Sequence, residues 1–262
     1  MGTLDTVKKF NSIVNVKGIE IGNNKPLVFM AGPCTIESTE QAERIEKAIK
    51  GAGAQVFRGG AFKPRTSPYS FQGLGYEGLD ILNELDMPTV SEITAIEQIP
   101  AFIEKVDIIQ VGARSMQNFE LLKALGKIDK PILLKRGFGS TIEEWLCAAE
   151  YILVGGNKNV ILCERGIRTF DNETRFTLDL SSVVYVKKIS SLPVIVDPSH
   201  AAGKASLVKD LALAAIAAGA DGLIIEVNDN PKTSISDPEQ AITPEELKEI
   251  IDKANKIKEI VK

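Results

Sequence analysis

Short hydrophobic runs rich in Val, Ile and Leu recur along the chain and alternate with longer amphipathic segments. This alternation is typical of parallel β/α units. The runs are hydrophobic throughout rather than at every second position, which favours strands buried on both faces of a sheet. We count eight predicted strands, at residues 27–31, 55–57, 88–90, 107–111, 132–135, 160–162, 194–196 and 222–225.

The segments between these runs carry signals for the ends of helices. Gly51 and Gly219 stand where two helices should end. Behind Ser38, hydrophobic residues recur at helical spacing, so one face of that helix can pack on the strands. Three pairs of residues have the spacing of a capping box: Ser38 with Gln41, Ser140 with Glu143, and Thr243 with Glu246.

Eight β/α units in 262 residues predict an α/β protein, a (β/α)8 TIM barrel that forms a single catalytic domain over residues 1–262. A doubly wound open sheet is the alternative, and the lack of an early Gly-x-Gly-x-x-Gly turn makes it less favoured. Residues 13–21 alternate around a Lys17-Gly18 turn, which predicts a short N-terminal β-hairpin at the bottom of the barrel. Since the first barrel strand begins near residue 27, we expect no regulatory domain and no inhibition by phenylalanine or tyrosine.

Composition narrows the possible partners. The net charge is −4 and the pI is near 5.3, which argues against nucleic acid as a partner. Three cysteines do not suggest a disulfide framework, so we expect a cytoplasmic protein. The sequence shows neither a signal peptide nor a hydrophobic run of membrane-spanning length, and we expect no membrane contact.

The loop at residues 58–68 is the most informative segment of the chain. It carries the cations Arg58, Lys63 and Arg65 together with the hydroxyls of Thr66 and Ser67, between glycines and prolines. Arginine forks match phosphate and carboxylate groups, and glycine lets backbone amides approach them. Small anions are therefore the expected substrates.

Other cations also follow predicted strands, on the barrel face where active sites lie. Together they form an arc suited to two phosphorylated ligands, or to a phosphate and a carboxylate. Any one of them alone could be a solvated surface charge. The full set is Arg58, Lys63, Arg65, Arg114, Lys135, Arg136, Arg165 and Arg168.

A second group of strand-end residues combines sulfur, nitrogen and oxygen donors: Cys34, His200, Glu226 and Asp237. Such a set suits a borderline divalent cation such as Mn²⁺, Fe²⁺ or Zn²⁺. Each residue also has a simpler explanation, because a cysteine often fills a core and an aspartate often caps a helix. Cys147 and Cys163 are interpreted as packing residues.

Six motifs together resemble a known enzyme family over residues 14–262. The resemblance is to 3-deoxy-D-arabino-heptulosonate 7-phosphate (DAHP) synthase, of the compact type (class I, beta subtype) related to 3-deoxy-D-manno-octulosonate 8-phosphate synthase. The motifs are Ala31-Gly32-Pro33-Cys34, the whole 58–68 loop, Phe71-Gln72-Gly73, Gly112-Ala113-Arg114 with Met116-Gln117-Asn118, Asp197-Pro198-Ser199-His200, and Ile225-Glu226-Val227.

The resemblance implies a metal-dependent transferase of the shikimate pathway, which leads to aromatic amino acids. It would condense phosphoenolpyruvate with erythrose 4-phosphate and water, giving DAHP and phosphate. It implies a divalent metal, with Mn²⁺ preferred and Fe²⁺, Zn²⁺ or Co²⁺ possible, and a homodimer or homotetramer. The implied metal ligands are Cys34, His200, Glu226 and Asp237.

The resemblance also assigns the substrate-binding residues. Arg65 and Thr66, in the Lys63-Pro64-Arg65-Thr66 loop, would hold the phosphate of erythrose 4-phosphate. Lys63 is our candidate for proton transfer to the aldehyde, with a water near His200 or Cys34 as the alternative. The residues implied around phosphoenolpyruvate are Arg58, Lys63, Arg114, Lys135, Arg165 and His200.

Two alternative functions are considered: that of the octulosonate relatives, and that of a barrel without catalytic activity. The octulosonate relatives use arabinose 5-phosphate and read Lys-Ala-Asn-Arg-Ser in this loop, so Pro64-Arg65-Thr66 favours erythrose 4-phosphate here. The Gly112-Ala113-Arg114 motif also favours erythrose 4-phosphate as the acceptor. Asn228 departs from a histidine common in similar sequences and could alter metal preference. A catalytically silent barrel that binds phosphosugars is the alternative from another class.

Overall fold

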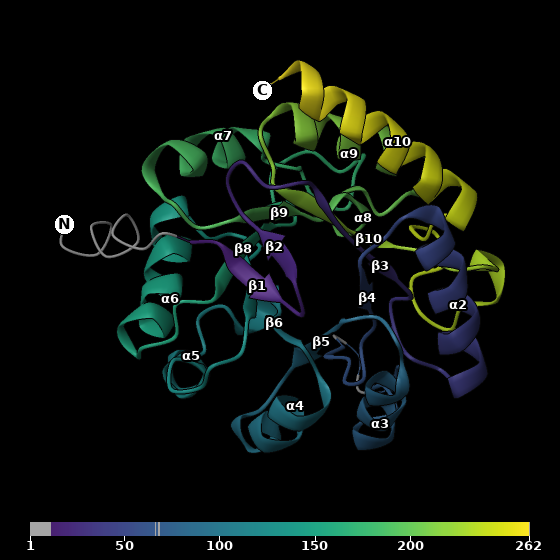
Figure 1. The fold of residues 1–262 in the computed structure, drawn as a ribbon, viewed down its shortest axis with the longest axis horizontal. Helices are drawn as coiled ribbons and strands as arrows, with labels where there is room; N and C mark the ends of the chain where they lie inside the picture. Colours follow the sequence, from purple (N-terminus) through teal and green to yellow (C-terminus); the bar gives the residue numbers. More distant parts are fainter. Residues whose placement is uncertain (1–11, 66, 68, 262) are drawn as a thin grey trace.

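The computed structural model describes residues 12–65, 67 and 69–261. Eight parallel strands close into a barrel, and helices surround it (Figure 1). Neighbouring strands are hydrogen-bonded in the order β10-β3-β4-β5-β6-β7-β8-β9. This closure confirms the predicted (β/α)8 barrel and rules out the open sheet. The strands are β3 (Val28–Gly32), β4 (Val56–Arg58), β5 (Thr89–Ile93), β6 (Ile108–Val111), β7 (Ile132–Lys135), β8 (Val160–Glu164), β9 (Val194–Val196) and β10 (Gly222–Glu226).

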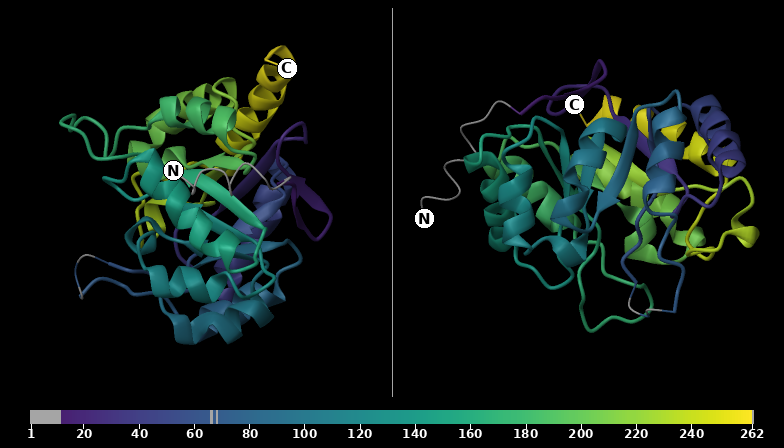
Figure 2. Two further views of the ribbon diagram at one scale, coloured as in Figure 1. Left: turned by 90° about the vertical axis from the view of Figure 1, so that its left-hand side faces the viewer. Right: turned by 90° about the horizontal axis from the view of Figure 1, so that it is seen from below.

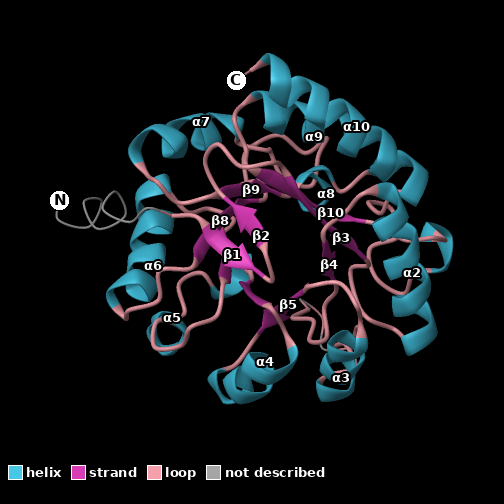
Figure 3. Cartoon of the chain, in the orientation of Figure 1, coloured by secondary structure: helices cyan, strands magenta, loops and turns pink. Residues whose placement is uncertain are grey.

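The helices form the outer ring, as the colouring by secondary structure shows (Figure 3). Short 3-10 turns η1 (Ile96–Gln98), η2 (Ala113–Ser115) and η3 (Pro231–Thr233) lie in the connections. Among the described residues, no helix is long and hydrophobic enough to cross a membrane. The helices are α2 (Thr39–Ala52), α3 (Tyr76–Glu84), α4 (Ile99–Lys105), α5 (Phe119–Leu125), α6 (Ile142–Val154), α7 (Leu180–Ile189), α8 (Pro198–Ala202), α9 (Ala205–Ala217) and α10 (Pro244–Ile260).

The hydrophobic core has two layers because successive side chains of a strand point to opposite faces. One layer fills the space between strands and helices and includes Phe29, Phe57 and Trp145. The other fills the barrel interior and includes Met30 and Ile161. Both faces of each strand are therefore buried, which is why the strands appear as continuous hydrophobic runs in the sequence.

The predicted N-terminal hairpin is present and closes one end of the barrel. Strands β1 (Val14–Val16) and β2 (Ile19–Ile21) pair antiparallel. Val14, Val16 and Ile21 are 0–3% exposed and belong to the hydrophobic cluster inside the barrel. The hairpin lies across the barrel centre in Figure 1, and the right view of Figure 2 shows it at the end opposite the long loops.

Of the three predicted capping boxes, the one at Thr243 and Glu246 is confirmed. Ser38 is the N-cap of α2 and accepts from the Gln41 N–H, but the Gln41 side chain accepts from the Glu37 N–H, so the box is not closed. The third box is wrong by one residue. Thr141 caps α6, with Glu144 as its partner, whereas the Ser140 carbonyl accepts a hydrogen bond from Arg136. Helix α2 also continues past Gly51 and ends at Gly53, whose φ of 102° is the left-handed conformation that glycine adopts readily.

The hairpin's burial predicts a stability difference between two isoleucines. Ile21→Ala should lower the free energy of unfolding by about 2 to 4 kcal/mol, because it leaves a cavity beneath the barrel. Ile13→Ala is the matched control, since Ile13 is 37% exposed and should cost far less. Denaturant unfolding of both variants measures the difference. Equal losses would show that the hairpin does not close the barrel interior.

Candidate active site

The site arises from the two-residue period of the strands. Beyond the last hydrophobic residue inside the barrel, the next inward position of each strand is polar or glycine. These positions form one layer at the carboxyl end of the barrel, where active sites of this fold lie. The layer consists of Gly32, Arg58, Glu92, Gln110, Lys135, Arg165, Asp197 and Glu226.

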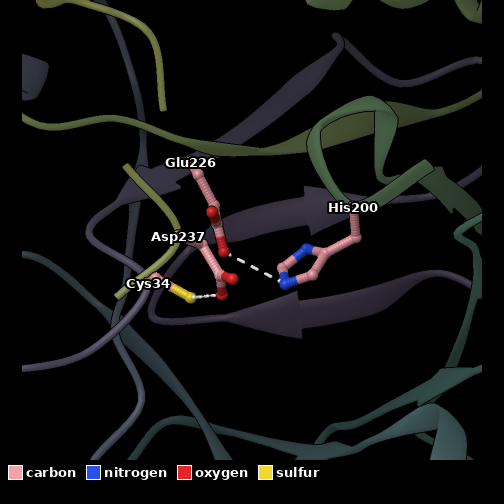
Figure 4. A group of neighbouring side chains, drawn as sticks. All are labelled: Cys34, His200, Glu226 and Asp237. Carbon is pink, nitrogen blue, oxygen red and sulfur yellow. Dashed lines mark hydrogen bonds and ion pairs between the residues drawn. The ribbon is translucent and has the colours of Figure 1, made fainter. Parts of the chain in front are cut away.

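Four side chains from this end of the barrel meet in one cluster (Figure 4). Cys34 follows β3, His200 lies on α8, Glu226 ends β10, and Asp237 lies in the loop after η3. One potential ligand atom from each residue lies within 4.8 Å of those from the other three. The structure thus brings together the four residues that the sequence suggested as metal ligands.

The donor set of this cluster fits a borderline divalent cation. One thiol, one imidazole and two carboxylates supply sulfur, nitrogen and oxygen. The Cys34 Sγ donates to Asp237 Oδ2 at 2.9 Å, and His200 Nε2 lies 3.0 Å from Glu226 Oε1. Burial and the nearby Glu226 raise the pKa of the Cys34 thiol, so a bound cation would have to displace this proton.

Asp197 determines how the His200 ring is oriented. It caps α8 by accepting from the His200 backbone N–H at 2.9 Å, and its Oδ2 lies 2.7 Å from Nδ1. These contacts turn Nε2 towards Glu226. Lys135 Nζ also donates to Asp197, at 2.5 Å. Burial alone would raise the pKa of Asp197, but His200 and Lys135 hold it well below its usual range.

Glu226 is held by three neighbours besides His200. Arg58 Nη1 donates to Oε1 at 3.0 Å, and Gln240 Nε2 donates to Oε2 at 2.7 Å. The Ser199 hydroxyl accepts from the Glu226 backbone N–H. Burial opposes ionisation of Glu226, yet His200 and Arg58 hold its pKa well below the ordinary value. This carboxylate therefore stays charged and fixed in place.

Lys63 lies between the cluster of four candidate metal ligands and the cationic side of the site. Its Nζ contacts Cys34 Sγ and lies 3.5 Å from Asp237 Oδ2. Burial lowers the pKa of Lys63, but Cys34 and Glu226 outweigh burial and raise it above the ordinary lysine value. Lys63 therefore carries its proton in this environment.

A cleft of about 240 Å³ opens beside the cluster. Lys135, Arg114 and Arg165 line it, and a smaller recess continues from it to Arg58 and Cys34. The Arg165 guanidinium carbon lies 4.9 Å from the Phe138 ring centroid and 4.2 Å from that of Phe176. Burial lowers its pKa to about 10, and its buried Nη1 has no hydrogen-bond partner. This cationic, partly unsatisfied lining fits an anionic ligand.

The residues predicted to bind substrate mostly gather at this cleft. Arg58 lies in the deeper recess, and Thr66 is outside the described residues. Those that line the cleft itself are Lys63, Pro64, Arg65, Gly112, Ala113, Arg114, Lys135, Arg165 and His200.

Two cations of the predicted arc line neither the cleft nor the deeper recess. Arg136 points out of the barrel and donates to Glu164 and Asp179 at 3.1 and 2.8 Å. It faces outwards because Lys135, its neighbour on the strand, faces inwards. Arg168 lines a surface depression that shares Ala113, Arg114 and Phe138 with the cleft, and its guanidinium carbon lies 5.5 Å from the Phe138 ring centroid. Asn228 is engaged in a turn, accepting from the Asn230 N–H, and is not part of the cluster.

Several residues of the site were given no role from the sequence, although Asp197 stood in one of the motifs. Glu92, Phe138 and Arg175 line the cleft, while Asp197 and Gln240 hold the cluster. The signal for Asp197 was its place before Pro198, which is typical of a helix N-cap. Glu92 could have been found as the inward position after Val90. Arg175 and Gln240 lie in irregular loops and have no comparable pattern.

The fold and site define a (β/α)8-barrel protein with a cationic cleft beside a cluster of side chains that could hold a metal ion. The chain matches the model of the DAHP synthetase I family over residues 8–262. It belongs to this family. The match covers the whole barrel and both groups of candidate site residues.

Curated relatives include both product types of this superfamily. The chain is 47% identical over 251 residues to a phospho-2-dehydro-3-deoxyheptonate aldolase from Thermotoga maritima, covering 94% of this chain and 74% of the relative. It is 31% identical over 271 residues to a 2-dehydro-3-deoxyphosphooctonate aldolase from Geobacter sulfurreducens, covering 95% and 98%. The heptonate relative is thus the more similar of the two.

Two solved structures from Thermotoga maritima have closely similar folds. A crystal structure of phospho-2-dehydro-3-deoxyheptonate aldolase aligns with a TM-score of 0.91 at 46% identity, covering 95% of this chain and 74% of that chain. A truncated form of 3-deoxy-D-arabino-heptulosonate 7-phosphate synthase also gives 0.91, at 40% identity, covering 99% and 98%. The barrel described above is therefore shared with these enzymes.

The orientation of His200 by Asp197 can be tested through metal affinity. Asp197→Asn removes the charge that fixes the imidazole, and partners of this kind contribute about 10- to 100-fold to affinity. We expect Mn²⁺ binding, measured by equilibrium dialysis, to weaken by about this factor. Asp210→Asn on the exposed face of α9 is the control. Unchanged binding by Asp197→Asn would show that His200 is positioned by other contacts.

Proposed function

We propose that this protein is a DAHP synthase, which condenses phosphoenolpyruvate with D-erythrose 4-phosphate and water to give DAHP and inorganic phosphate. This is the first step of the shikimate pathway. The observation that carries the proposal is the adjacency of a cationic cleft and a four-ligand cluster at one barrel end. Family membership and the 47% identity to a heptonate aldolase support the same activity.

Phosphoenolpyruvate fits the cationic side of the cleft. It carries a carboxylate and a phosphate, and its charge must be offset before a second phosphorylated molecule can approach. Arg114 and Arg165 have no protein carboxylate within ion-pair distance among the described residues, so they are available for these anions. We assign phosphoenolpyruvate to Arg58, Lys63, Arg114, Lys135, Arg165 and His200.

Erythrose 4-phosphate would extend from the cluster towards the mouth of the cleft. Its aldehyde would lie near Lys63, and its phosphate near Arg65 and Thr66. Cys34, His200, Glu226 and Asp237 would hold the divalent cation, which when bound supplies Lewis acidity that makes a carbonyl more electrophilic. Mn²⁺ is our preferred cation, with Fe²⁺, Zn²⁺ and Co²⁺ as alternatives.

The reaction can be written with these residues in defined roles. C3 of phosphoenolpyruvate forms a bond to the aldehyde carbon, and the ammonium of Lys63 supplies a proton to the aldehyde oxygen. Bond formation uses the C2–C3 double bond and leaves an oxocarbenium-like cation at C2. Water adds at C2 and loses one proton, which can return Lys63 to its ammonium form. The C2–O bond to phosphate then breaks as the new C2 hydroxyl loses its proton and becomes the ketone, and this proton leaves with inorganic phosphate. Arg114 and Arg165 would bind the phosphate group throughout, first as part of phosphoenolpyruvate and then as inorganic phosphate. Because these cations are already in place, they would stabilise the negative charge that develops on the phosphate as it leaves.

The choice between acceptors rests on the 58–68 loop. The side chains of Pro64 and Arg65 reach the cleft, and the octulosonate relatives differ in this loop. The lower identity to the octonate aldolase, 31%, agrees with a tetrose acceptor. We further propose that the protein acts in the cytoplasm as a homodimer or homotetramer.

The proposed activity predicts chelator-sensitive release of phosphate. Purified protein with phosphoenolpyruvate, erythrose 4-phosphate and Mn²⁺ should release inorganic phosphate, and EDTA should abolish the release. Adding excess Mn²⁺ to the EDTA sample should restore it. Full activity in a rigorously metal-free sample would contradict the role of the four-residue cluster.

Arg65 is predicted to recognise the acceptor rather than phosphoenolpyruvate. Arg65→Ala removes a charge-assisted contact to phosphate, so the KM for erythrose 4-phosphate should rise by about 10-fold or more. The KM for phosphoenolpyruvate should change much less. Steady-state kinetics with each substrate varied in turn measures both values. Equal increases would place Arg65 outside the acceptor site.

A further inference from the structure

Arg175 belongs to the long connection between β8 and α7. This connection extends from the barrel end opposite the hairpin (Figure 2). The backbone of Arg175 is pinned to α8, because its N–H donates to the Ala202 carbonyl at 3.1 Å. Gly203 ends α8 with a φ of 67°, and a Cβ there would lie 2.6 Å from that of Arg175. The residue after α8 must therefore be glycine for Arg175 to occupy this place.

One edge of the Arg175 guanidinium is held by the protein and the other is open. Nη1 donates to Gln240 Oε1 at 3.0 Å and lies 3.7 Å from Asp237 Oδ1. Within the described residues, Nε and Nη2 form no hydrogen bond. The side chain is 40% exposed and lines the cleft. A guanidinium fixed along one edge presents its remaining donors to a ligand in a defined direction.

Arg175 and Arg65 stand together at the mouth of the cleft. A groove of about 560 Å³ adjoins the cleft, and both arginines line both spaces. By contrast, Lys135, Arg114 and Arg165 line the cleft but not the groove. Among the cations of the described residues, only these two line both spaces, so they lie where the cleft meets the groove. Asp237 also lines both spaces, whereas Cys34 lies in the deeper recess on the other side of Lys63.

We propose that Arg175 binds the phosphate of the acceptor sugar together with Arg65. This inference rests on the function proposed above. The acceptor must place its aldehyde near Lys63, so its phosphate has to lie at the mouth of the cleft. Gln240 donates to Glu226 and accepts from Arg175, which ties the position of Arg175 to the cluster. Arg175 thereby sets the distance between the two ends of the acceptor.

The test compares three variants with the unaltered enzyme. Arg175→Gln removes the charge and the fork, Arg175→Lys keeps the charge alone, and Lys209→Gln removes a cation from α9, where it pairs with Glu249. We measure KM for erythrose 4-phosphate and for phosphoenolpyruvate, kcat, and Mn²⁺ affinity by equilibrium dialysis.

For Arg175→Gln we expect the KM for erythrose 4-phosphate to rise about 10-fold or more, with the KM for phosphoenolpyruvate and the Mn²⁺ affinity within about threefold of the unaltered enzyme. Arg175→Lys should recover part of the loss, and Lys209→Gln should change nothing. Equal rises in both KM values would overturn the proposal. So would weaker Mn²⁺ binding with both KM values unchanged, because Arg175 would then only support the cluster.

Failure of the proposed function would give a different result from failure of the inference about Arg175. If the unaltered enzyme releases no phosphate from phosphoenolpyruvate and erythrose 4-phosphate, the reaction itself is wrong. If it does so and only the variant kinetics disagree, the inference about Arg175 alone is wrong.

Discussion

Two buried carboxylates, Asp197 and Glu226, constrain the whole carboxyl end of the barrel. Each is 1% exposed, and an unpaired buried charge costs several kcal/mol. Lys135 and Arg58 compensate them, and the His200 ring contacts both, which ties together β4, β7, β10 and α8. The active-site geometry is therefore a consequence of charge compensation: moving either carboxylate would leave Lys135 or Arg58 buried without its partner.

This network divides the cations of the site into two kinds. Lys135 and Arg58 are already paired with protein carboxylates, so they are fixed before any substrate arrives. Arg165 is instead held against aromatic rings, and its donors remain partly unsatisfied. A ring that packs on the face of a guanidinium leaves the N–H donors in the plane of that group free to bind an anion. Both kinds belong to the phosphoenolpyruvate site proposed above; the first kind is fixed by protein carboxylates before substrate binds, and the second has no protein carboxylate to release.

Most of the barrel and most of the residues that gather at its site could be predicted from the sequence. Continuous hydrophobic runs located all eight strands because both strand faces are buried, and polar residues after those runs located Cys34 and Glu226. Arg136 was misplaced because proximity to a strand end does not say which way a side chain faces. Gln240 and Arg175 could not be found, since their positions depend on tertiary contacts of irregular loops.

The central claim is that this end of the barrel joins phosphoenolpyruvate to a four-carbon acceptor. The most direct measurement is a competition in which phosphoenolpyruvate is limiting, erythrose 4-phosphate and arabinose 5-phosphate are present in equal amounts with Mn²⁺, and the products are identified by mass spectrometry. Our account predicts the seven-carbon product DAHP in large excess. A predominance of the eight-carbon product, or no condensation product at all, would contradict it.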